Sequence, residues 1–87
     1  MRKLGIIGGA SWNSTALYYE HINRGVAQRL GGLHSARLVI ESLDFEDDYA
    51  AFHRVEDWAG AEKVIQAAAE RLKSAGAEGL LLGSNTM

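Results

Sequence analysis

Three short apolar runs, each ended by glycine or small polar residues, constrain the fold of this chain most strongly. They span residues 4–7, 38–40 and 80–82, and none of them alternates cleanly between apolar and polar positions. Short continuous runs of this kind are typical of strands buried on both faces, as in a parallel sheet. The sequence therefore predicts three buried strands.

A helical pattern separates the first two runs. Its inward positions recur every three or four residues and comprise Thr15, Tyr19, Ile22, Val26 and Leu30. Tyr19 is expected to face inward and Tyr18 to lie near the helix edge. The candidates for the N-cap are Ser11, Asn13 and Ser14, and Gly31-Gly32 supplies the stop.

A second helical pattern precedes the third run, and its stripe comprises Trp58, Ala61, Ile65, Ala68, Leu72 and Ala75. Asp57 is the candidate N-cap and Gly76 lies just past the end. The segment 43–56, with its acidic run 46–48, is interpreted as a solvated loop with one helical turn.

Strand, helix, strand, helix, strand is the order that results. Right-handed crossovers would make the three strands parallel and leave helices on the sheet faces. The predicted fold class is thus α/β, a three-layer arrangement with a short parallel sheet in βαβαβ order. The length of 87 residues suits one small domain, spanning residues 1–87.

Charge and composition narrow the classes of partner. The formal net charge of -2 argues against nucleic acid or a polybasic membrane surface, and no cysteine is present for a disulfide or a thiolate zinc site. No apolar segment approaches the roughly 18 residues of a membrane span, so a cytoplasmic setting is expected. The histidines are spaced too irregularly to predict a metal site; His53 is the one that could face a pocket.

The segments 8–11, 42–44 and 83–86 each follow a predicted strand. Ligands of open α/β sheets bind beyond the carboxyl ends of the strands, so these segments are expected to lie side by side. Gly8 and Gly9 either make a tight turn into the helix or let backbone amides bind a carboxylate or phosphate.

Three small polar residues in the last segment, Ser84, Asn85 and Thr86, also leave two readings open. Hydroxyl and amide groups together can hold a carboxylate and an amino group at once. The same residue types are favoured at a helix N-cap. A serine-hydrolase motif is excluded on pattern, because Gly83 directly precedes Ser84 where G-x-S-x-G is needed.

Taken together, four stretches resemble the amino-terminal half of the aspartate/glutamate racemase family: KLGIIGGASWNSTALYYEHIN, RLGGLHSARL, SLDFEDDYA and LLLGSNTM. The branch it resembles carries an S-W-x-S-T-x-x-Y-Y signature. The resemblance implies two similar α/β domains with the active site between them, of which this chain would hold half or less. It also implies a cofactor-independent racemase that moves the α-proton of acidic amino acids.

The resemblance also implies roles for individual residues. Ser84 occupies the position of the first acid–base residue, which is usually a cysteine, and it precedes an Asn-Thr pair. Asn85, Thr86 and the Gly9-Ala10-Ser11 turn would hold the polar groups of the substrate. Ala10 and Asn13 depart from the family, which usually has methionine and glutamate there.

The second catalytic residue of the family lies in a half that this sequence does not show. The chain alone is therefore expected to be inactive, and its partner would be a complementary carboxy-terminal half or a second copy. The expected ligand is a small acidic amino acid or dicarboxylate. The alternative is a non-catalytic module that binds small carboxylates or a partner protein.

Overall fold

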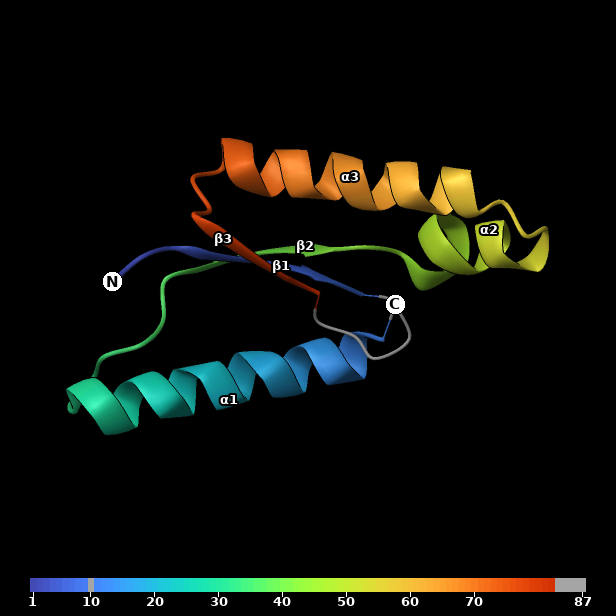
Figure 1. Ribbon diagram of the computed structural model, residues 1–87. Helices are drawn as coiled ribbons and strands as arrows, with labels where there is room; N and C mark the ends of the chain where they lie inside the picture. Colours follow the sequence, from blue (N-terminus) through green and yellow to red (C-terminus); the bar gives the residue numbers. More distant parts are fainter. Residues whose placement is uncertain (10, 83–87) are drawn as a thin grey trace.

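The computed structural model describes residues 1–9 and 11–82, apart from the side chains of Tyr49 and His53. Within this part, the strands β1 (Leu4–Gly8), β2 (Leu38–Ser42) and β3 (Gly79–Leu82) form one sheet in the order β2-β1-β3 (Figure 1). Both pairings are parallel. The predicted parallel sheet in βαβαβ order is confirmed.

Two long helices, α1 (Trp12–Leu30) and α3 (Trp58–Ser74), lie on opposite sides of this sheet (Figure 1). The strand order explains the placement. β2 and β3 flank β1 on opposite edges, so two right-handed crossovers place their helices on opposite faces. The result is the three-layer arrangement expected from the sequence.

Local capping follows the sequence closely. Ser11 is the N-cap of α1, although its side chain makes no cap hydrogen bond, and Gly31 ends the helix with a φ of 75°. The Asp57 carboxylate accepts a hydrogen bond from the Gly60 amide (2.9 Å) and so caps α3. Just past α3, Gly76 has a φ of 95°, a conformation that glycine adopts without steric cost.

The packed core lies between the sheet and α3. Ile7 and Leu43 contact Ala68 and Leu72 of α3 there, and Leu72 is 1% exposed. On the other face, Thr15 is the buried residue of α1. Ile6 is 0% exposed and its side chain points to the opposite face from that of Ile7, so the central strand is buried on both faces.

Four inward positions predicted from helical periodicity are wrong, because the side chains there are exposed: Tyr19, Leu30, Trp58 and Ala75. Tyr19 is 49% exposed whereas Tyr18 is half-buried, and Trp58 is 58% exposed. A helix the length of α3 extends about 25 Å, but a five-residue strand covers only about 17 Å. The ends of the helix therefore reach beyond the sheet, and Trp58 is the first residue of α3.

The segment 43–56 is more helical than expected. Instead of a loop with one turn, it contains a π-helix, η1 (Phe45–Ala50), that continues into α2 (Ala51–Arg54). Asp44 starts this segment, because its carboxylate accepts hydrogen bonds from the Glu46 and Asp47 amides at 2.9 and 3.3 Å. The wider turn of a π-helix gives no 3.6-residue stripe, so periodicity does not reveal it.

Replacing Leu72 with alanine tests the packed cluster between the sheet and α3. Leu72→Ala should lower the free energy of unfolding by about 2–5 kcal/mol, because the side chain is fully buried against the sheet. Leu33→Ala is the matched control: Leu33 is fully exposed, and its loss should change the free energy of unfolding by less than about 0.5 kcal/mol. Urea unfolding followed by circular dichroism measures both, and equal effects would contradict this description of the core.

Candidate functional site

The segments that follow β1 and β2 meet at the carboxyl edge of the sheet. The Leu43 amide donates a hydrogen bond to the Gly8 carbonyl at 2.8 Å, which continues the β1–β2 pairing by one residue. A Cβ added at Gly9 would overlap the backbone of Leu43 and lie 2.9 Å from its carbonyl carbon. The predicted convergence of these two segments is therefore confirmed.

Glycine is required at both position 8 and position 9, because neighbouring atoms leave no room for a Cβ at either position. Gly9 has a φ of 93°, a region that residues with a Cβ rarely adopt. A Cβ on Gly8 would lie 2.6 Å from both Cγ2 and Oγ1 of Thr15. Of the two readings that the sequence left open, the tight strand-to-helix turn is thus present, whereas anion binding by this turn stays a prediction.

Thr15 ties the two sides of this turn together. Its Oγ1 accepts a hydrogen bond from the Gly9 amide (3.1 Å) and donates one to the Ser11 carbonyl (3.2 Å). The sequence placed Thr15 on the inward stripe of the helix but did not reveal this role. The four-residue spacing from Ser11 could have indicated the second bond, since threonines in helices often bond the carbonyl four residues back.

The end of β3 lies beside the end of β1, because Leu82 pairs with Ile7. The crossovers that involve these strands run on opposite faces of the sheet, so this is the point where the strand order reverses. In open α/β sheets that point is the usual place of a ligand crevice. Four predicted site residues fall outside the described residues, namely Ala10, Ser84, Asn85 and Thr86.

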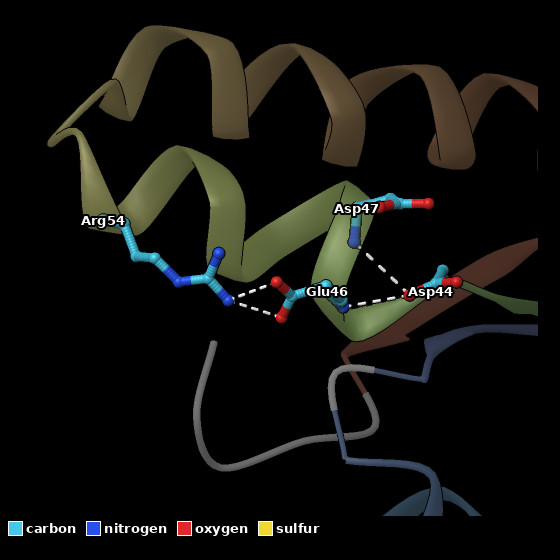
Figure 2. A network of polar contacts seen from close by, with 4 residues as sticks. All are labelled: Asp44, Glu46, Asp47 and Arg54. Atoms are coloured by element: carbon cyan, nitrogen blue, oxygen red, sulfur yellow. Dashed lines mark hydrogen bonds and ion pairs between the residues drawn. The ribbon is translucent and has the colours of Figure 1, made fainter.

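The residues of the segment after β2 form a network of polar contacts with one another (Figure 2). Besides accepting from two amides, Asp44 donates its own amide to Oδ2 of Asp48 at 2.9 Å. Arg54 donates to both carboxylate oxygens of Glu46, and this hydrogen bond, together with the negative charge, raises the pKa of Arg54. The acidic run is thus the start of a helix rather than the loop expected, whereas Glu46 and Asp47 are exposed to solvent as predicted.

The described part of the chain contains neither a cluster of three or more potential metal-ligating side chains nor a helix that could span a membrane. No group of three histidine, aspartate or glutamate side chains there is placed to hold a metal ion. His21 and His34 are exposed, and the side chain of His53 lies outside the described residues. Among the same residues, no helix is long and apolar enough to cross a membrane.

Comparisons of the sequence and of the fold with known proteins agree with each other. A sequence profile of the Asp/Glu/Hydantoin racemase family matches residues 7–87. The fold is similar to the crystal structure of a candidate Asp/Glu racemase from Yersinia pestis, at 45% sequence identity with a TM-score of 0.95 over 100% of this chain. It is also similar to an aspartate racemase homologue from Pyrococcus horikoshii OT3, at 33% identity with a TM-score of 0.78 over 99% of this chain. The chain spans 37% of the length of each of these two.

Gly9→Ala, compared with Gly31→Ala, tests the close approach at the end of β1. Both glycines have positive φ, but nothing lies within 4 Å of a Cβ at Gly31, whereas one at Gly9 overlaps Leu43. Gly31→Ala should cost about 1–3 kcal/mol from the backbone conformation alone, because its φ of 75° and ψ of 177° lie in a region that is essentially restricted to glycine. Gly9→Ala should cost a further 1–3 kcal/mol or so from overpacking. Urea unfolding compares the two, and an equal loss would show that Leu43 can move aside.

Proposed function

This chain belongs to the Asp/Glu/hydantoin racemase family, and we propose that it forms one wall of a racemase active site for acidic amino acids. The site lies at the carboxyl edge of the sheet, between the ends of β1 and β3. The observation that carries the proposal is the glycine turn, because it leads from a buried strand straight into the start of a long helix. The positive end of a helix dipole favours a carboxylate there.

The proposed reaction is removal of the α-proton and its return on the opposite face. It needs an acid–base group on each side of the substrate, and hydrogen-bond donors fixed on the carboxylate where negative charge builds up. In this proposal Ser84 provides the group on one side, without a cofactor. Asn85, Thr86 and the turn formed by residues 9–11 bind the polar groups of the substrate.

The second acid–base group lies outside this chain in the proposal. The two solved relatives are longer, since the chain spans 37% of each. We therefore assign the other wall to a complementary carboxy-terminal half or to a second copy, and expect no racemisation by the 87-residue chain alone. The single amino-terminal α/β domain and its cytoplasmic setting stay predictions of the same kind.

A second candidate function is binding of small carboxylates without chemistry. The observation that favours it is the residue type at position 84. A cysteine thiol titrates near pH 8.5 and can be tuned lower, but a serine hydroxyl does not ionise usefully near neutral pH without help. The glycine turn would then be a recognition element for a ligand that leaves unchanged.

Titration with ligand tests the proposed binding site. It compares two variants, each of which replaces one side-chain amide with alanine. Calorimetry should show binding of aspartate or glutamate, and Asn85→Ala should weaken it about tenfold because one hydrogen bond is lost. Gln66→Ala is the matched control, because Gln66 is an exposed amide on α3, and it should leave the affinity unchanged. No detectable binding of either acid would contradict the proposal.

Deuterium uptake at the α-carbon separates the two candidate functions. In D2O the isolated chain should bind the amino acid without racemising it, because the opposite acid–base group is missing. Racemisation should appear when the remaining part of the Yersinia pestis relative is added as a separate chain. Turnover by the isolated chain would refute the need for a second wall, and binding that never leads to exchange would favour the carboxylate-binding module.

A further inference from the structure

One buried polar residue stands out among the described residues. Thr15 is 7% exposed, and it is the residue through which α1 is anchored to the end of β1. A buried hydroxyl is costly unless its hydrogen-bonding capacity is used. Here it is used on both sides of the turn, toward the Gly9 amide and toward the Ser11 carbonyl.

We propose that Thr15 is the positioning residue of the β1–α1 turn, an inference that rests on the carboxylate site proposed above. A threonine hydroxyl can donate one proton while it accepts another hydrogen bond. By donating to Ser11 and accepting from Gly9, Oγ1 fixes the distance and angle between the strand end and the N-cap of α1. The amides at the start of α1, which have no acceptor inside the helix, are thereby aimed in one direction.

The hydrogen bond from the Gly9 amide to Thr15 also decides which backbone amides are available to bind a ligand. The Gly9 amide already has an internal acceptor at 3.1 Å, so its contribution is the backbone conformation that it makes possible. The donors for a substrate carboxylate then come from the first turn of α1. Loss of the Thr15 hydroxyl would leave the Gly9 amide without a partner, and the turn would reorient to recover one.

Packing and hydrogen bonding by Thr15 can be separated, because they use different atoms. Its side chain lies where Gly8 would carry its own, with Cγ2 and Oγ1 each 2.6 Å from the position of an added Cβ. Thr15→Val keeps the branched shape and removes the hydroxyl, whereas Thr15→Ser keeps the hydroxyl and removes a methyl group. A merely structural role would depend on shape, and a positioning role depends on the hydroxyl.

The first measurement is amide hydrogen exchange of Gly9 by nuclear magnetic resonance, which needs no ligand. In the wild-type chain and in Thr15→Ser this amide should exchange slowly relative to an unprotected glycine amide. In Thr15→Val it should exchange at least about tenfold faster, while the amides of Ile6 and Ile7 in the central strand keep their protection. Fast exchange of the Gly9 amide in the wild-type chain would overturn the proposal, even if Thr15→Val failed to fold.

The second measurement is the dissociation constant for aspartate. Thr15→Val should raise it about tenfold, and Thr15→Ser should retain most of the affinity. If Thr15→Ser weakened binding as much as Thr15→Val did, packing rather than the hydroxyl would be decisive and the positioning role would be refuted. If the wild-type chain bound no acid at all, the proposed function would fail, but the Gly9 exchange rates would still decide the role of Thr15.

Discussion

The structure depends on one close approach, at the end of the central strand. Gly8 and Gly9 carry no side chains. The Leu43 backbone can therefore pack against Gly9, and the Thr15 side chain against Gly8. The first contact brings in the segment that follows β2, and the second brings in α1. Protein interiors are packed too densely to absorb an added methyl group at such a point. The sheet edge, the helix start and the acidic segment are thus joined through two glycines.

Much of the fold could be predicted because its signals are local. Apolar runs located the strands, and Asp57, Gly31 and Gly76 marked helix limits that the structure reproduces. Periodicity failed where exposure depends on what lies opposite. Tyr19 belongs to a regular stripe, but the half-buried side of α1 runs through Tyr18, Ile22 and Val26, so the Tyr19 side chain stays exposed. The helical content after β2 was underestimated because the π-helix has no 3.6-residue signature.

The candidate site was predictable to the level of segments, but not of individual hydrogen bonds. Parallel strands bring their carboxyl ends to one edge, so sequence order alone places the segments after β1 and β2 together. Which atoms meet depends on the orientation of α1 against the sheet. The bond from the Gly9 amide to Thr15 follows from that packing. The pairing of Glu46 with Arg54 instead depends on how η1 continues into α2.

The central position of β1 also governs how the chain must fold. The amide of Lys3, just before β1, bonds the carboxylate of Glu78, and the amide of Glu78 bonds the carbonyl of Lys3, across a separation of 75 residues. Loop-closure entropy has to be overcome before such distant pairings contribute any stability. During synthesis, β1 therefore leaves the ribosome long before its second neighbour exists. The pairing of β1 with β3 must wait until residues 79–82 have been synthesised, so β1 cannot be fully paired before then.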